Sequence, residues 1–135
     1  MTILVIDGQG GNLGKQIVKT LLNRFADIDL LAVGTNSIAT ENMLKAGAER
    51  AATGENAVVV CADKADIIIG PLGIVIADAL LGEVTEKMAC AVSRSRAKRI
   101  LIPVSKCETL VAGVQSVSTA ELIEDAVKKA EKLLQ

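Results

Sequence analysis

The chain has no histidine, no tryptophan and no tyrosine, and its single aromatic residue is Phe25. Without histidine, neither a Ser-His nor a Cys-His catalytic pair can form. One aromatic side chain also leaves no platform on which the bases of single-stranded nucleic acid could stack. These absences exclude several common catalytic and binding classes before any motif is considered.

Cysteine is scarce as well. Cys61, Cys90 and Cys107 are odd in number, widely spaced and not arranged as C-x-x-C. Because no histidine completes a ligand set, we expect no structural metal site and no disulfide framework. The expected state is three reduced thiols.

The charges nearly balance, with 15 Lys and Arg against 16 Asp and Glu. This balance predicts that neither nucleic acid nor an acidic membrane surface is a partner. The longest apolar stretch, residues 67–81, is interrupted by Gly70, Pro71, Gly73 and Asp78, and it is too short to span a bilayer. No basic region precedes the first apolar run, so we expect no secretory signal and a cytoplasmic location.

Short apolar runs alternate with helical patterns along the 135 residues, which predicts one domain over residues 1–135. The expected strands lie near residues 3–6, 28–33, 50–52, 66–69 and 99–104, with a possible sixth at 110–114. Continuously apolar strands between helices indicate a parallel sheet buried on both faces. We therefore predict a doubly wound, Rossmann-like α/β fold with a mostly parallel sheet of five or six strands. Its expected order is 3-2-1-4-5.

Helices are expected after each of the first four strands, including residues 56–62, 74–81 and 85–95. A last helix over residues 119–134 is opened by a capping box formed by Ser118 and Glu121.

A glycine cluster follows the first apolar run and leads directly into a helical pattern. Strand, glycine turn and helix bring a phosphate group to the unpaired N–H groups and positive dipole of a helix N-terminus. We therefore predict a site for a nucleotide or other phosphate-bearing small molecule, formed by Gly8, Gln9, Gly10, Gly11, Asn12, Leu13 and Gly14. The alternative is that these glycines only serve a tight turn.

Other strand ends meet the same edge of a parallel sheet, near the point where strand order reverses. The segments expected there are residues 34–37, 53–56, 70–73 and 105–107, and all are small or polar. The further candidate ligand-binding residues are Thr35, Asn36, Ser37, Gly70, Pro71 and Gly73.

The spacing Gly8-x-x-Gly11-x-x-Gly14 resembles the loop of extended short-chain dehydrogenases and of some small NAD(P)-dependent reductases. It departs from the strict G-x-G-x-x-G form, because Leu13 stands at the last glycine position. A dinucleotide-binding chain usually has a carboxylate after the second strand for the ribose hydroxyls. Here residues 34–37 contain none, and their hydroxyl and amide groups favour NADP over NAD.

Two other interpretations of the loop fit less well. A P-loop does not fit, since Gln9 occupies its first glycine position and Gln16 replaces the hydroxyl that binds magnesium. Residues 7–11 also resemble the first motif of S-adenosylmethionine methyltransferases. Those domains usually have a longer chain and an acid after the second strand.

Catalytic groups are few, and without tyrosine the Tyr-x-x-x-Lys pair of short-chain dehydrogenases is missing. Lys106 would favour the thiolate form of Cys107, although an ordinary, partly buried cysteine is the favoured explanation of that residue. Asp78 is the only charge within residues 74–81, where burial would suit it to proton transfer. A structural aspartate facing solvent is the alternative. Whether the protein is an enzyme stays open.

Five strings carry a resemblance that runs nearly end to end: ILVIDGQGGNLGKQ, LLAVGTNSIAT, AATGENAVVV, DIIIGPLGIVIADALLGEVT and SRAKRILIPVSKC. On these strings the chain is identified as a member of an uncharacterised family of short bacterial proteins, a domain of unknown function. The resemblance implies a small Rossmann-like protein and supplies no activity and no catalytic residue.

The sequence thus predicts a stand-alone nucleotide-binding protein whose ligand is NAD or NADP, with no metal. The competing hypothesis is a structural or interaction subunit that keeps the fold without a cofactor. Its apolar residues 74–81 would then form a subunit interface, and a homodimer is expected under either hypothesis.

Overall fold

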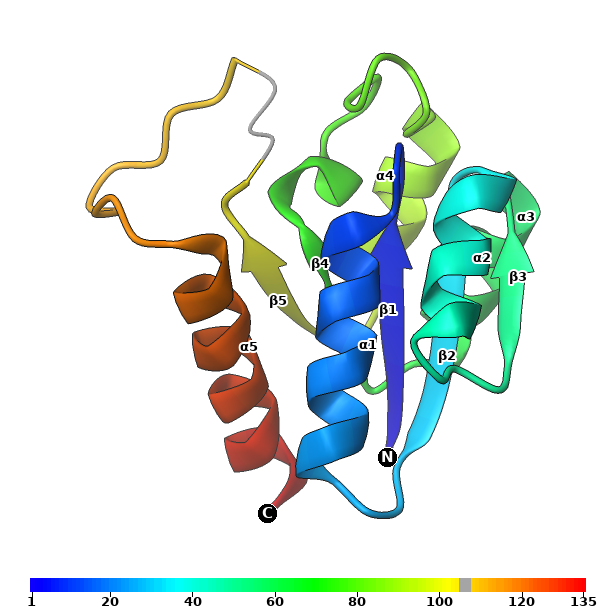
Figure 1. Cartoon of the computed structure of the whole chain (residues 1–135). Coiled ribbons are helices and arrows are strands. Elements are labelled where there is room, and N and C mark those ends of the chain that lie inside the picture. The colour runs from blue at the N-terminus through cyan, green and yellow to red at the C-terminus, as the bar shows by residue number, and fades with distance from the viewer. Residues whose placement is uncertain (105–107) are drawn as a thin grey trace.

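A computed structural model, describing residues 1–104 and 108–135, has a sheet covered by helices on both faces (Figure 1). The described residues contain five strands: β1 (Thr2–Asp7), β2 (Asp29–Gly34), β3 (Ala51–Thr53), β4 (Ile67–Pro71) and β5 (Lys98–Ile102). All neighbouring strands pair in parallel, in the order β3-β2-β1-β4-β5. The predicted Rossmann-like α/β fold and its strand order are confirmed.

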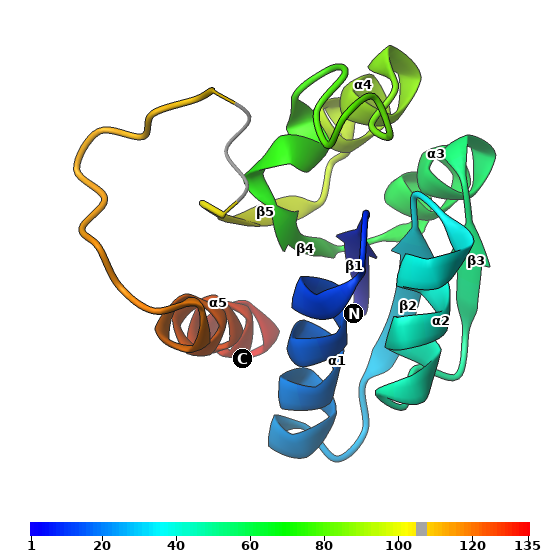
Figure 2. The same cartoon turned by 45° about the horizontal axis from the view of Figure 1, so that its top comes forward.

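The strands are joined by helices α1 (Asn12–Arg24), α2 (Ser37–Lys45), α3 (Glu55–Lys64) and α4 (Glu86–Arg94), with a short 3-10 helix, η1 (Leu72–Val75), directly after β4. The last helix, α5 (Thr119–Leu134), starts where predicted, because Ser118 Oγ accepts a hydrogen bond from the Glu121 N–H. Helices α1, α2 and α5 cover one face of the sheet, and α3 and α4 cover the other (Figure 2). No helix within the described residues has both the length and the apolar character needed to cross a membrane.

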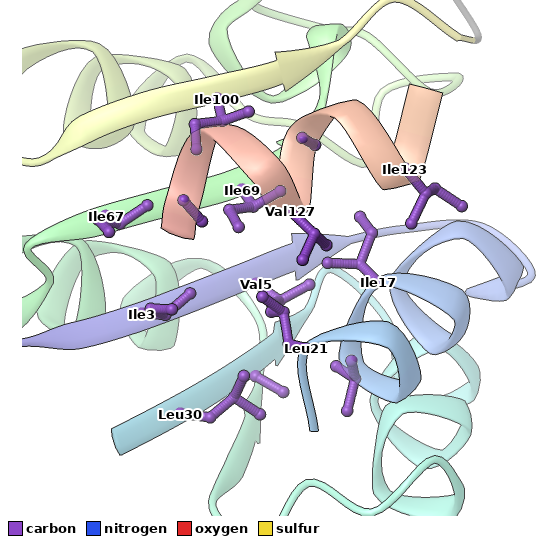
Figure 3. Close-up of a cluster of buried hydrophobic side chains, with 14 of the residues drawn as sticks. Ile3, Val5, Ile17, Leu21, Leu30, Ile67, Ile69, Ile100, Ile123 and Val127 are labelled. Atoms are coloured by element: carbon purple, nitrogen blue, oxygen red, sulfur yellow. The ribbon is translucent and has the colours of Figure 1, made fainter. Parts of the chain in front are cut away.

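The central strands are buried on both sides because successive side chains point to opposite faces. In β1, Ile3 and Val5 belong to the core beneath α1 and α5, which Figure 3 shows in close-up. Leu4 and Ile6 belong to the core beneath α3 and α4. Asp7 ends the strand, and its position in the alternation places its side chain on the α1 side.

The possible sixth strand at residues 110–114 does not form. These residues, which the structure describes, form turns and irregular backbone, and Gly113 has a left-handed φ of 81°. They lie in a long connection that arches away from the helices and the sheet before α5 begins (Figure 2).

The helix predicted at residues 74–81 is also wrong. Only η1 is helical there, and turns follow it up to α4. Asp78, Leu80 and Leu81 have φ values of 66°, 57° and 58°, which a right-handed helix excludes. The segment over residues 76–84 therefore folds back on the sheet edge as a series of turns.

Candidate functional site

The order of the strands reverses beside β1, since the chain first adds β2 and β3 on one side and then crosses to β4 on the other. Ligands of doubly wound sheets bind at this place, beyond the carboxyl ends of the strands. A cavity of about 190 Å³ lies there, lined by residues 7–13, Pro71, Leu80 and Val104. The predicted glycine loop thus forms most of the cavity wall.

Three of the four loop glycines are needed by the packing of the chain itself. A Cβ added at Gly8 or Gly11 would come within 2.5 Å of another residue, and one at Gly14 within 2.7 Å. Gly11 also has a φ of 74°, which side chains rarely adopt. A Cβ at Gly10, in contrast, would meet nothing within 4 Å. Gly10 is therefore the glycine of the four that leaves room for a ligand.

The N-terminus of α1 opens onto this loop. Gly11 is its N-cap and supplies no side-chain hydrogen bond, while the Gly14 N–H donates to Asp7 Oδ2 at 2.6 Å. Among the described residues, the N–H groups of Asn12 and Leu13 have no acceptor. Unpaired N–H groups at a helix N-terminus are suited to bind an anionic group.

Asp7 is a buried carboxylate beneath the loop, with 5% of its surface exposed. Burial raises its pKa, and this outweighs the lowering by hydrogen bonds from the Gly14 and Gly8 N–H groups. The nearby charge of Glu83 raises the pKa further.

Glu83 brings a second carboxylate to the site from residues 76–84. Its Oε1 accepts hydrogen bonds from the Gln9 N–H at 2.9 Å, from Thr35 Oγ1 at 2.8 Å and from Asn36 Nδ2 at 2.7 Å. Desolvation tends to raise the pKa of Glu83, but these three hydrogen bonds outweigh it and lower the pKa. An ionised carboxylate therefore lies between the glycine loop and the residues that follow β2.

Our sequence reasoning missed Glu83, because nothing in its local pattern shows that it reaches residues 35 and 36. The available signal is indirect. Residues 34–37 contain no carboxylate, although dinucleotide-binding chains usually have one there. Glu83 lies in the segment that follows β4, whose carboxyl end meets the same edge of the sheet.

Thr35, Asn36 and Ser37 lie at the end of β2, as predicted. Asn36 Oδ1 caps α2 by accepting from the Ala39 N–H, and Ser37 is the exposed first residue of that helix. The prediction of NADP assumed that Thr35 and Asn36 were free to donate to a 2′-phosphate. Both donate to Glu83 instead.

Of the three candidates at the carboxyl end of β4, Pro71 lines the cavity. Gly70 lies within the strand, where a Cβ would approach the Ile6 carbonyl oxygen to 2.5 Å, so it serves strand packing. Gly73 is buried in η1.

The candidate catalytic residues are not brought together in the described part of the chain. Asp78 is exposed in the turn segment, where its N–H donates to the Val84 carbonyl oxygen at 2.7 Å. It lacks the burial that would have suited it to proton transfer. Lys106 and Cys107 lie outside the described residues. Within residues 1–104 and 108–135, no group of three or more Asp, Glu or Cys side chains could hold a metal ion.

A larger hollow of about 280 Å³ lies at the opposite end of the sheet, lined by Leu22 and residues 26–30 and 47–50. Its basic side chain, Arg50, pairs with Asp29. It contains neither the glycine loop nor the start of a helix after a strand, so the cavity at the order reversal is the stronger candidate.

Comparison with known proteins adds a family and no activity. No curated protein matches the chain. Among solved structures, the chain is similar to a dodecameric FMN-dependent UbiX-like decarboxylase from Escherichia coli O157:H7, with a TM-score of 0.46 and 12% identity over 98% of this chain and 93% of that one. It is also similar to TubZ of Clostridium botulinum phage c-st, with a TM-score of 0.42 and 12% identity over 97% of this chain and 47% of that one.

Since folds of this kind serve many unrelated functions, neither similarity bears on what this protein does. The family described as Domain of unknown function (DUF3842) matches residues 2–135 and thus nearly the whole chain. The chain therefore belongs to the DUF3842 family.

Proposed function

We propose that this DUF3842 protein binds a nucleotide at the loop over residues 8–14. The observation that carries the proposal is the open side of that loop. Gly10 faces free space, and the unpaired N–H groups of Asn12 and Leu13 border the same cavity. A phosphate group accepts hydrogen bonds from such N–H groups and is favoured by the dipole of α1.

The conformation of the loop supports the proposal. Gln9 has a φ of 49°, although it is not a glycine. Residues with a strained backbone persist only where the surrounding structure holds them, and they are concentrated at ligand-binding and active sites.

The cavity suits part of a nucleotide rather than all of it. Its volume of about 190 Å³ lies below the roughly 300–1,000 Å³ of pockets that enclose a drug-sized ligand. A phosphate and a ribose would fill it, and the base would extend over the exposed edge of the sheet. NAD is such a ligand. It is favoured over NADP because Thr35 and Asn36, which could donate to a 2′-phosphate, already donate to Glu83.

The competing proposal is a structural subunit without a cofactor. Residues 74–81 do not supply the subunit interface expected for it, because Ile74, Ala79 and Leu80 are buried in the chain's own core. A different observation does, namely the exposed apolar side chains of the connection before α5: Leu110, Val111, Val114 and Val117. A homodimer formed there is compatible with both proposals.

The test is nucleotide binding by the wild-type protein and by Gly10→Val, measured as the shift of the thermal midpoint in circular dichroism. The ligands to compare are NAD, NADP, FMN, ATP and S-adenosylmethionine. A ligand at 100 times its Kd stabilises the folded state by about 2.7 kcal/mol, which raises the midpoint by several degrees. We expect one nucleotide to do so, and Gly10→Val to weaken its binding at least tenfold while keeping the fold.

Two further variants make the result specific. Ala52→Val places the same side chain at another exposed position of the sheet edge, and binding should not change. Gly11→Val is unsuitable as the test, since its Cβ would lie 2.5 Å from Ala39 Cα and disturb α2. If no nucleotide shifts the midpoint, or if Gly10→Val binds like the wild type, the loop is only a turn.

A further inference from the structure

The turn segment over residues 76–84 delivers a carboxylate to a position where the sequence supplies none. Residues 34–37, which end β2 and start α2, read Gly-Thr-Asn-Ser. In dinucleotide-binding folds an acid at this place accepts hydrogen bonds from the ribose hydroxyls. Here the Glu83 carboxylate accepts hydrogen bonds from Thr35 and Asn36 of that segment. Glu83 itself comes from the turns after β4 and not from the residues after β2.

The hydrogen bonds hold this carboxylate by one oxygen. Glu83 Oε1 accepts from the Gln9 N–H, the Thr35 hydroxyl and the Asn36 amide, which come from two different strand ends. Among the described residues, Glu83 Oε2 has no partner. The carboxylate is therefore oriented by the protein while one oxygen stays available as an acceptor.

We infer that Glu83 recognises the ribose of the bound nucleotide. Its free oxygen accepts hydrogen bonds from an unsubstituted 2′,3′-diol, and its charge excludes a nucleotide that carries a 2′-phosphate. The inference rests on the proposed function and names the ligand class of that site. A 2′-phosphate would meet a like charge and would find the Thr35 and Asn36 donors occupied.

A purely structural role for Glu83 makes a different prediction. If Glu83 only pins residues 76–84 to the sheet edge, Glu83→Gln should bind NAD and NADP in the same ratio as the wild type. The glutamine side chain keeps one acceptor oxygen of the same reach, so most of the pin is kept. What the substitution removes is the charge and the second acceptor oxygen.

The experiment is calorimetric titration of NAD and NADP into the wild type, Glu83→Gln and Glu86→Gln. Glu86 is exposed in the first turn of α4 and provides the matched removal of one negative charge. We expect the wild type and Glu86→Gln to bind NAD at least tenfold more tightly than NADP. We expect Glu83→Gln to lose at least tenfold in NAD affinity and to bind the two dinucleotides within about threefold of each other.

The inference is overturned if Glu83→Gln binds NAD as tightly as the wild type, or more tightly, since the carboxylate would then only occupy or block the site. It is also overturned if the wild type binds NADP as well as NAD. Both results leave the proposed function standing. Absence of any nucleotide binding by the wild type is the separate result that ends the proposed function, and this inference with it.

Discussion

Asp7 shows at the scale of one residue how the site combines opposing effects. Its Oδ2 accepts the Gly14 N–H, so the carboxylate sits at the positive end of α1, which favours the charged form. Burial favours the neutral form and has the larger effect, because the pKa of Asp7 is raised overall. The folded state therefore binds more protons at Asp7 than the unfolded state does.

This difference predicts the effect of Asp7→Asn on the pH dependence of stability. Since the folded pKa is raised, the contribution of Asp7 is fully present below its ordinary pKa and is lost as pH rises through the folded pKa. Asp7→Asn removes that loss, so the free energy of unfolding relative to wild type should increase with pH across this window. Urea denaturation followed by circular dichroism at several pH values measures it.

The exposed Asp63→Asn is the control, and its free energy of unfolding should follow the wild type at each pH. A constant difference between Asp7→Asn and wild type at all pH values would contradict the prediction. Glu83 acts in the opposite sense, because its lowered pKa gives a stability that is lost as pH falls. The two carboxylates therefore change the free energy of unfolding with pH in opposite directions, which distinguishes their contributions in the same pH series.

At the scale of the element, residues 76–84 contain a buried leucine next to an exposed one. Leu80 is 5% exposed and packs in the core beneath α3 and α4, whereas Leu81 is 97% exposed. Both have nearly the same left-handed φ, 57° and 58°. A substitution by alanine therefore changes the backbone strain of both alike, and the difference between them reports burial.

We expect Leu80→Ala to lower the free energy of unfolding by about 2–4 kcal/mol, because it removes buried methyl groups and leaves a cavity. Leu81→Ala should change it by less than about 0.5 kcal/mol. Urea denaturation of both variants is the measurement. Equal effects of the two substitutions would mean that Leu80 is not the residue that anchors this segment.

The same segment marks the limit of what the sequence predicts. Continuous apolar runs predict the central strands, and general rules for parallel sheets predict the strand order. The apolar residues of 74–81 predict a helix, and no local signal shows that Asp78 and Leu80 adopt left-handed backbone. The glycine loop could be located from its residues alone. The position of Glu83 could not be predicted, since it depends on how those turns fold against the ends of β1 and β2.

At the scale of the whole molecule, the connection before α5 is the least covered part of the described chain. Leu110 is 92% exposed, and Val111, Val114 and Val117 are exposed beside it. Exposed apolar surface of this kind marks interaction sites when it is contiguous, so this connection is a candidate contact surface. The extended course of this segment away from the body, visible in Figures 1 and 2, leaves these side chains accessible to a second copy.

We expect the purified protein to be a homodimer, and the double substitution Leu110→Ser and Val114→Ser to make it monomeric. Size-exclusion chromatography with light scattering gives the mass of each. The matched control is Leu44→Ser with Val60→Ser, which removes an exposed leucine and an exposed valine on α2 and α3. A monomeric wild type would contradict the prediction. A dimer that survives the Leu110→Ser and Val114→Ser substitutions would place the interface elsewhere.

Phe25 ends α1 as its C-cap, at the end of that helix farthest from the cavity, and the chain has no tryptophan or tyrosine. The protein is consequently almost transparent in the near ultraviolet, and it has no strong fluorophore of its own. A nucleotide that stays bound through purification would dominate the absorption spectrum. The colour and spectrum of the freshly purified protein thus identify an occupied site directly, without a label or an assay.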